Sequence, residues 1–197
     1  HFMTRALALA KRGLYSVPPN PMVGAVLVVE GRVVGEGWHR HAGGPHAEVE
    51  ALARWRRRRG PATLYVTLEP CVHQGRTPPC VDAILSAPIE RVVLASKDPD
   101  PRVNGRGIAY LRKAGLRVEA GLMSAEAAFL NRAFFRSKTV GLPYVIMKSA
   151  MTLDGRIADL SGRSFWITRE PARRQGQLLR EEVDAIIVGS RTALADD

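Results

Sequence analysis

The sequence predicts a layered α/β fold for most of the chain, followed by a shorter unit with strands and a helix of its own. β-branched runs alternate with segments in which apolar residues recur at helical spacing, a pattern typical of a sheet with helices on its faces. The 197 residues are 46% hydrophobic, which is enough for a substantial core. The periodicity breaks at residues 137–143, SKTVGLP, which predicts a linker between the two units.

The predicted elements of the first unit follow one another in a regular order. An amphipathic helix over residues 3–14 ends before the prolines of PPNP. Strands at 23–29 and 32–38 are joined by a Glu30-Gly31 hairpin turn. The remaining elements are predicted helices at 46–55, 81–87, 107–115 and 125–136, and predicted strands at 63–68, 91–95 and 116–121.

The second unit is predicted from residue 144 onwards. Strands at 144–150 and 185–189 flank a helix from Glu170 to about Glu182. About 55 residues are too few for an independent α/β domain. We therefore expect one complete domain, residues 1–140, followed by an incomplete second domain, residues 144–197.

A formal net charge of +10 at pH 7 favours phosphorylated small molecules or polyanions as partners. The densest basic run, RWRRRR at residues 54–59, precedes Gly60 at a predicted helix end, where cations complement the helix dipole. The run therefore indicates a solvated helix end rather than a nucleic-acid site.

Neither a membrane span nor a secretory signal is visible in the sequence. No apolar run approaches the ~20 residues that a spanning helix needs, and the start of the chain lacks the pattern of a signal peptide. We expect a cytoplasmic protein in a reducing compartment. A disulfide between Cys71 and Cys80 is then the weaker interpretation of the two cysteines.

Two cysteines and a histidine predict a zinc centre. Cys71 and Cys80, the only cysteines, lie in LEPCVHQGRTPPC, and His46 begins an HAE triplet at a predicted helix start. Two thiolates and one imidazole leave the fourth tetrahedral position open for water, which is the catalytic arrangement. The ion would lower the pKa of that water toward neutrality. Glu48, which is not needed as a ligand, would carry protons between the water and a substrate.

The spacing of the cysteines leaves an alternative open. Nucleobase deaminases carry H-x-E followed by P-C-x-x-C, whereas eight residues separate the two cysteines here, so the loop between them has to return. A structural zinc with four protein ligands would take His73, His39 or His41 as the fourth, but it would leave Glu48 without a role. Without the neighbouring histidine and cysteines, Glu48 would be interpreted as a solvated glutamate in a first helical turn.

Several motifs resemble a known family. PNPMVGAVLV, VGEGWHRHAGGPHAEVEAL, YVTLEPCVHQGRTPPC and KDPDPRVNGRG together resemble the deaminase domain of the bifunctional riboflavin-biosynthesis deaminase/reductase family, RibD, including its long cysteine spacing. YVIMKSAMTLDGRIA, SGRSFWIT and DAIIVGSRTALADD resemble the opening of that family's reductase domain. The resemblance covers essentially the whole chain. It implies a three-layer cytidine-deaminase-like domain followed by the truncated start of a dihydrofolate-reductase-like domain.

The resemblance implies a deaminase with a defined site. This activity removes the 2-amino group of 2,5-diamino-6-(5-phosphoribosylamino)pyrimidin-4-one by hydrolysis, with zinc on His46, Cys71 and Cys80 and with Glu48 as the proton shuttle. The substrate residues that it implies are Asn20, His39, His73 and Arg76. The positive charge of Arg76 suits the phosphate of such a substrate. From the residues alone, a turn role for Asn20 and a structural role for His39 are favoured.

The resemblance also implies a reductase that uses NADPH to convert the ribosyl group into a ribityl chain. The residues implied for it are Ser164 and Arg180 at the substrate and Ala150, Trp166, Thr192 and Asp196 at the cofactor. The resemblance further implies that family members continue well beyond the position that Asp197 occupies here. We therefore expect this chain to deaminate without reducing.

The leading alternative function is a deaminase that acts on tRNA or single-stranded nucleic acid, suggested by the basic charge. Such an enzyme has no need of the KxAxxLDG and WIT segments, and the chain lacks clustered surface aromatics for base stacking. A zinc-stabilised interaction module without catalysis ranks last. The expected partner is a phosphorylated pyrimidine. We expect no binding to a membrane, and binding to nucleic acid is disfavoured. Formation of a homo-oligomer is left open.

Overall fold

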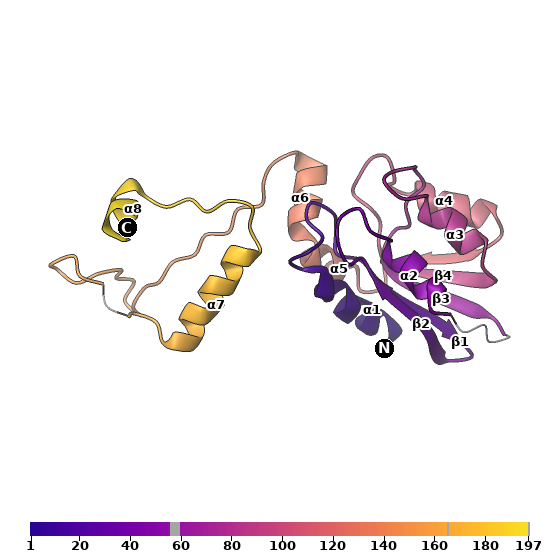
Figure 1. Ribbon diagram of the computed structural model, residues 1–197, viewed down its shortest axis with the longest axis horizontal. Helices are drawn as coiled ribbons and strands as arrows, with labels where there is room; N and C mark the ends of the chain where they lie inside the picture. The colour runs from indigo at the N-terminus through magenta and orange to yellow at the C-terminus, as the bar shows by residue number, and fades with distance from the viewer. Residues whose placement is uncertain (56–59, 165, 197) are drawn as a thin grey trace. The chain divides into compact units, whose positions relative to one another are not determined.

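The computed structural model describes residues 1–55, 60–164 and 166–196, except for the side chains of residues 195 and 196. The chain divides into two compact units, His1–Tyr144 and Val145–Asp197 (Figure 1). Residues 56–59, most of the basic run, lie outside the described part. Among the described residues, every helix is too short or too polar to cross a membrane.

A mixed sheet of five strands forms the centre of the first unit (Figure 1). The strands lie in the order β2-β1-β3-β4-β5. β1 pairs antiparallel with β2 and β3, whereas β3, β4 and β5 run parallel to one another. Their bounds are β1 Gly24–Val29, β2 Arg32–Trp38, β3 Ala62–Leu68, β4 Ile89–Ser96 and β5 Arg117–Ala120.

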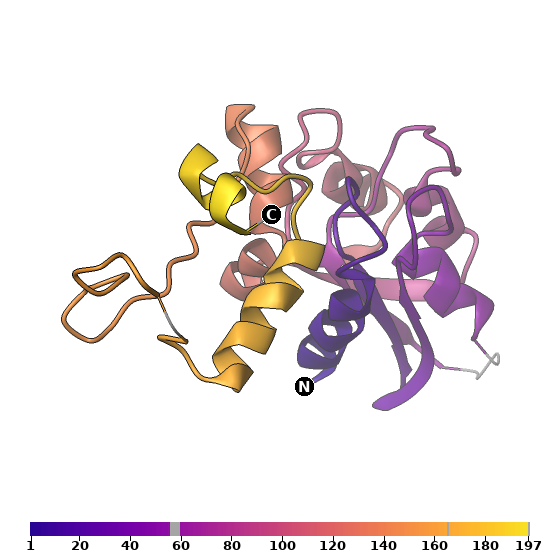
Figure 2. The same cartoon turned by 60° about the vertical axis from the view of Figure 1, so that its left-hand side comes forward.

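Helices cover both faces of this sheet, so that the unit has three layers (Figures 1 and 2). α1 (Phe2–Ala10) and α5 (Ser124–Leu130) pack on one face, in a core that includes Met3, Val93 and Ala127. The other face is covered by α2 (Ala47–Ala53), α3 (Cys80–Leu85) and α4 (Arg106–Lys113). The predicted layered α/β fold of this unit is thus confirmed.

Two glycines of β2 allow α2 to pack closely on that strand. A Cβ atom on Gly35 would lie 2.2 Å from the Ala51 carbonyl oxygen, and one on Gly37 would lie 2.3 Å from the Ala47 carbonyl oxygen. Both distances are far below van der Waals contact, so only glycine fits at either position. This close packing sets the position of the α2 N-terminus, where His46 and Glu48 lie.

The ends of the first unit differ from the sequence prediction. The first helix continues as a 3₁₀ turn, η1 (Lys11–Gly13). The helix predicted over 125–136 is two helices, α5 and α6 (Arg132–Val140), because Asn131 leaves helical geometry with φ −103° and ψ 26°. The buried side chain of Asn131 instead accepts a hydrogen bond from the Met22 N–H (2.8 Å) and donates one to the Met22 carbonyl oxygen (2.9 Å). α6 therefore occupies part of the predicted linker.

The second unit has two helices in its described residues, α7 (Glu170–Glu181) and α8 (Ser190–Asp196). α7 confirms the helix predicted at 170–182. The strands predicted at 144–150 and 185–189 are wrong, since neither segment pairs with another strand within the described residues. A β-branched run forms a strand only when a neighbouring strand supplies hydrogen bonds. Val145 and Ile187 are instead 80% and 95% exposed.

Candidate metal centre and active site

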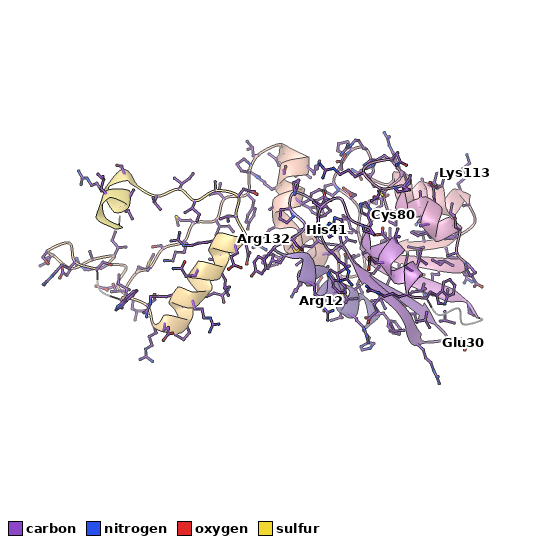
Figure 3. All side chains as sticks on the ribbon, in the orientation of Figure 1. Arg12, Glu30, His41, Cys80, Lys113 and Arg132 are labelled. Atoms are coloured by element: carbon purple, nitrogen blue, oxygen red, sulfur yellow. The ribbon has the colours of Figure 1, made fainter. Side chains whose placement is uncertain are left out.

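The three predicted metal ligands converge, although they come from three different elements. His46 is the N-cap residue of α2, Cys71 follows the end of β3, and Cys80 is the first residue of α3. The His46 Nδ1 atom lies 3.0 Å from the Cys80 Sγ atom and 3.6 Å from the Cys71 Sγ atom. Within the described residues, these three form the one His/Cys/Asp/Glu group that could hold a metal ion. Figure 3 marks Cys80 in the first unit.

The spacing of these atoms fits zinc. Zinc bonds of about 2.3 Å to sulfur and about 2.0 Å to nitrogen, at tetrahedral angles, separate neighbouring ligand atoms by roughly 3.5–3.8 Å. The separation of 3.6 Å between His46 Nδ1 and Cys71 Sγ lies in this range. The 3.0 Å separation to Cys80 Sγ is shorter, so that thiol has to move by about half an ångström.

The loop between the cysteines returns, as the long spacing requires. The Cys80 N–H donates a hydrogen bond to the Cys71 Sγ atom, and the Val81 N–H donates one to the Cys71 carbonyl oxygen, each at 3.3 Å. Both cysteines are free thiols, so the structure does not contain the disulfide alternative. Backbone donors thus bring the first turn of α3 against Cys71.

The protein groups alone favour a thiolate at Cys71. A hydrogen bond from the Cys80 thiol lowers the pKa of Cys71, and the neighbouring His46 lowers it further against the effect of burial. The same hydrogen bond raises the pKa of Cys80, which acts as its donor. The contact with Cys71 raises the pKa of His46. The cluster therefore combines a negative charge on Cys71 with protons on Cys80 and His46, and a bound cation would displace these protons.

Glu48 is a buried carboxyl group beside this cluster. It is 3% exposed, and its Oε2 atom has no hydrogen-bond partner within the described residues. Burial raises the pKa of Glu48 to about 7, because the charged form loses its hydration. A carboxyl group with a pKa close to the working pH both accepts and donates protons.

Asn20 and His39 contact each other at one side of the cluster. His39 Nδ1 lies 3.0 Å from the Pro45 carbonyl oxygen, and Asn20 Nδ2 lies 3.0 Å from His39 Nε2. Burial lowers the pKa of His39, so the neutral ring donates to Pro45 and accepts from Asn20. The rings of His39 and His46 lie 5.2 Å apart, nearly perpendicular. Both nitrogens of His39 are therefore engaged, which argues against this residue as a fourth metal ligand.

The loop residues between the cysteines lie in three different environments. His73 is half-buried, and its Nδ1 atom is without a hydrogen-bond partner in the described part of the chain. Arg76 is exposed and lies against Gly43, where an added Cβ would be 3.6 Å from the arginine Cδ atom. The Thr77 Oγ1 atom lies 3.4 Å from His46 Nε2, the ring nitrogen that faces away from the thiols. The sequence does not single out Thr77, because a threonine before two prolines is not a distinctive signal.

The residues predicted for a reductase site lie in the second unit and are exposed or only half-buried where they are described. Trp166 is 72% exposed, and the Arg173 guanidinium lies 3.9 Å from its ring centroid. The side chain of Asp196 lies outside the described part. Among the described members of this set, no hydrogen bond or ring contact joins two of them: Ala150, Ser164, Trp166, Arg180 and Thr192. The structure does not bring them together into a cofactor site.

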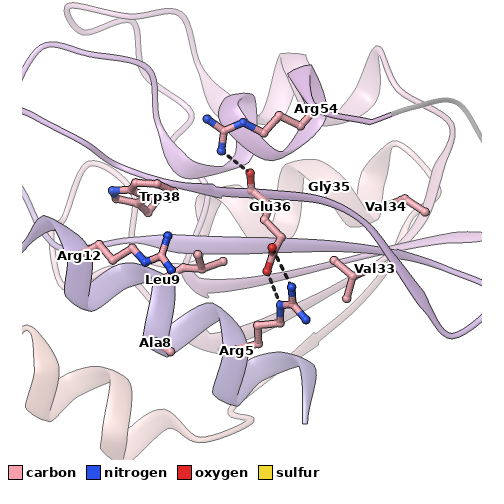
Figure 4. A pocket seen from close by; sticks show the side chains of 10 residues that line it. All are labelled: Arg5, Ala8, Leu9, Arg12, Val33, Val34, Gly35, Glu36, Trp38 and Arg54. Carbon is pink, nitrogen blue, oxygen red and sulfur yellow. Dashed lines mark hydrogen bonds and ion pairs between the residues drawn. The ribbon is translucent and has the colours of Figure 1, made fainter.

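An open pocket of about 830 Å³ lies between α1 and the edge strand β2 (Figure 4). Its lining contains none of the three metal-ligand candidates. Arg5 forms an ion pair with Glu36, and the Arg54 guanidinium donates to the Glu36 carbonyl oxygen at 2.9 Å. Arg12 lies over the Trp38 ring, 5.0 Å from its centroid. These contacts connect α1 and the end of α2 to β2.

Two family models match the chain. Residues 1–96 match the cytidine and deoxycytidylate deaminase zinc-binding region, a span that contains His46, Cys71 and Cys80. Residues 143–197 match the RibD C-terminal domain.

The chain is also similar to longer proteins. Riboflavin biosynthesis protein RibD of Escherichia coli K12 is 51% identical over 197 residues, which is 100% of this chain and 54% of that protein. The structure of Acinetobacter baumannii RibD matches with a TM-score of 0.92 and 49% identity, over 99% of this chain and 55% of that one. A diaminohydroxyphosphoribosylaminopyrimidine deaminase/5-amino-6-(5-phosphoribosylamino)uracil reductase from Thermotoga maritima matches with a TM-score of 0.91 and 44% identity, over 99% of this chain and 56% of that one. The chain spans about half the length of these relatives.

Proposed function

Because this chain belongs to the RibD family of riboflavin biosynthesis proteins, we propose that its first unit is a hydrolytic deaminase of 2,5-diamino-6-(5-phosphoribosylamino)pyrimidin-4-one. The name of the Thermotoga maritima relative states this activity together with a reductase activity. The observation that carries the proposal is the buried carboxyl group of Glu48 beside His46, Cys71 and Cys80. A purely structural metal site has no use for such a group.

The proposed reaction replaces the 2-amino group by an oxygen atom from water and releases ammonia. Zinc held by His46, Cys71 and Cys80 would supply the Lewis acidity that makes water nucleophilic near neutral pH. Glu48 accepts one proton from the attacking water and gives it to the ring nitrogen, and it then carries the second proton, from the hydroxyl group so formed, to the amine, which leaves as ammonia. The burial that raises its pKa to about 7 favours this exchange in both directions.

We propose that substrate contacts come from Asn20, His39, His73 and Arg76. Neutral His39, held by the Pro45 carbonyl oxygen, orients the Asn20 amide toward the base. Arg76 is exposed and has no carboxylate partner within the described residues, so its charge is available to the phosphate of the ribose arm. The half-buried His73 lies on the same loop as Arg76 and completes this set.

We further propose the domain limits 1–140 and 144–197, with the second domain corresponding to part of the family's reductase. The residues implied for NADPH do not form a cradle in the described part of this unit, so no reduction step is assigned to them. A reducing cytoplasmic setting suits the free thiols of the first unit.

The experiment that tests the proposed function compares substrates. Ammonia release by the zinc-loaded protein is followed with the phosphoribosylamino pyrimidinone, with its dephosphorylated form, with cytidine and with tRNA. We expect rapid release from the first compound, a raised KM for the dephosphorylated form because the contact with Arg76 is lost, and no release from cytidine or tRNA. Deamination of tRNA in preference to the pyrimidinone would support the nucleic-acid alternative instead.

A further inference from the structure

Glu69 is a buried acidic residue that the proposed mechanism does not use. It lies between the end of β3 and Cys71 and is 3% exposed. Its Oε2 atom accepts hydrogen bonds from the backbone N–H groups of Gly105 (2.8 Å) and Asp98 (3.2 Å). Its Oε1 atom accepts a third from the N–H of Ile108 (3.1 Å). A buried carboxylate with three backbone donors is a strong and directional anchor.

The three donors come from the KDPDPRVNGRG segment, residues 97–107, and from the first turn of α4. Gly105 is the N-cap residue of α4 and has no side chain to cap the helix, and the first turn of α4 contains no acidic residue. Free N–H groups and the positive end of the helix dipole favour a carboxylate at this position. Glu69 therefore caps α4 from 36 residues upstream.

The same contacts restrain the backbone that leads to Cys71. The Glu69 N–H donates to the Ser96 carbonyl oxygen at the end of β4 (3.0 Å). The Pro70 carbonyl oxygen lies against Gly107, where an added Cβ would approach it to 2.3 Å. Glu69 and Pro70 are thus held by the end of β4 on one side and by the start of α4 on another. The next residue in the chain is Cys71, one of the three metal-ligand candidates.

We infer that Glu69 is a positioning residue for the metal centre, because its carboxylate fixes the Pro70–Cys71 turn against the 97–108 segment and so places the Cys71 thiolate opposite His46 and Cys80. The inference rests on the proposed zinc site. It also accounts for the KDPDPRVNGRG segment, since its backbone N–H groups hold the strand end that carries a ligand.

The first test is Glu69→Gln in the full 197-residue chain. Both carboxylate oxygens accept N–H bonds, so the amide NH₂ group of glutamine has to face at least one donor. We expect zinc affinity, measured by competition with a chelator, to fall by about 10- to 100-fold, the loss typical of groups that orient metal ligands. In the metal-free protein, amide exchange at Cys80 and Val81 should accelerate, because their N–H groups bond to Cys71.

The control is Val93→Ala, which removes buried methyl groups on the opposite face of the sheet. It should lower stability but leave zinc affinity at the wild-type value. Amide exchange at Cys80 and Val81 is compared after correction for the global stability of each variant. Faster local exchange in Glu69→Gln than in Val93→Ala is the expected result.

A second variant, Gly107→Ala, displaces the same turn without changing Glu69. Helix propensity alone predicts a gain in stability from alanine. The contact between its Cβ and the Pro70 carbonyl oxygen instead predicts weaker zinc binding, as in Glu69→Gln. If both variants bind zinc with wild-type affinity and exchange like Val93→Ala, Glu69 only caps α4 and the inference is wrong. If the wild-type protein binds no zinc, the proposed function fails, while the exchange data still decide the role of Glu69.

Discussion

Glu48 and Asp98 are both buried carboxyl groups whose pKa is raised by burial, to about 7 and about 6. The hydrogen-bond partners of the two carboxyl groups differ, and so do the roles that we assign to them. The Oδ1 atom of Asp98 accepts a hydrogen bond from the Asp100 N–H at 2.8 Å, so this side chain shapes a loop. The Oε2 atom of Glu48 has no partner in the described part of the chain, and the Glu48 carboxyl group interacts electrostatically with His46 and Cys71. Glu48 therefore combines a raised pKa with a buried acceptor atom that has no partner within the described residues.

Asp98 predicts a pH-dependent change in stability. Burial, with repulsion from Asp100 and Glu69, outweighs the hydrogen bond from the Asp100 N–H and the attraction from Lys138, so the folded pKa of Asp98 is higher than the unfolded value. The protonated form therefore fits the fold, and its stabilisation is fully present below about pH 4 and lost as the pH rises through about 6. The neutral amide of the Asp98→Asn variant resembles this protonated form.

We expect Asp98→Asn to raise the free energy of unfolding at pH 8, by up to about 3 kcal/mol for a shift of about two pKa units. The difference from the wild-type protein should shrink as the pH falls toward 4. Urea unfolding of both proteins between pH 4 and pH 8 measures it. A difference that does not change with pH, or a loss of stability at pH 8, would show that the charge of Asp98 is not the cause.

At the scale of single residues, the sequence predicts the candidate catalytic and metal-binding residues better than the residues that hold the surrounding backbone in place. His46, Glu48, Cys71 and Cys80 stand out because few other arrangements use these residue types together. Glu69 and Asn131 do not stand out, since their partners lie 36 and 109 residues away and are backbone groups that every residue carries. Only the folded chain shows which side chains meet them.

The elements of the first unit follow the hydrophobic pattern of the sequence closely. Predicted strands 63–68 and 91–95 correspond to β3 Ala62–Leu68 and β4 Ile89–Ser96. The order of the sheet is not visible in the pattern, because it depends on the parallel pairing of strands that are distant in the sequence. The strands predicted at 144–150 and 185–189 fail for the same reason: strand formation needs a partner, and apolar periodicity does not supply one.

The packing of α2 on β2 predicts a selective effect of Gly37→Ala. The added Cβ would meet the Ala47 carbonyl oxygen at 2.3 Å and the Ala51 nitrogen at 2.5 Å, so α2 has to move. We expect a loss of about 1–3 kcal/mol in the free energy of unfolding, as in other overpacked sites. Zinc affinity should fall as well, because His46 is the N-cap residue of this helix.

Gly75→Ala is the matched control for this prediction. Gly75 lies in the loop between the cysteines, and a Cβ there meets nothing within 4 Å. Thermal unfolding and chelator competition should give wild-type values for this variant. Wild-type stability and zinc affinity in Gly37→Ala would contradict the proposed role of the close packing.

The two units of the molecule differ in how much apolar surface they bury. The buried hydrophobic side chains lie between Met3 and Ala127, and within the described residues none lies in Val145–Asp197. Both core clusters and all three metal-ligand candidates belong to His1–Tyr144. We therefore expect the first unit to fold and to bind zinc by itself.

A fragment of residues 1–144 tests this independence. We expect cooperative thermal unfolding within a few degrees of the transition of the full chain, because the fragment keeps both core clusters of the described residues. The fragment should bind one zinc ion and release ammonia from the pyrimidinone at the rate of the full chain. An unfolded or aggregated fragment would mean that the second unit contributes to the stability of the first.

The central claim is that Glu48 transfers protons in a zinc-dependent deamination at His46, Cys71 and Cys80. The most direct measurement is ammonia release from the phosphoribosylamino pyrimidinone by wild-type protein and Glu48→Gln, with zinc content determined in the same samples. We predict one zinc per chain in both proteins and a rate about 10²- to 10⁴-fold lower in the variant, since only proton transfer is removed. Wild-type ammonia release by Glu48→Gln at full zinc occupancy would contradict the account.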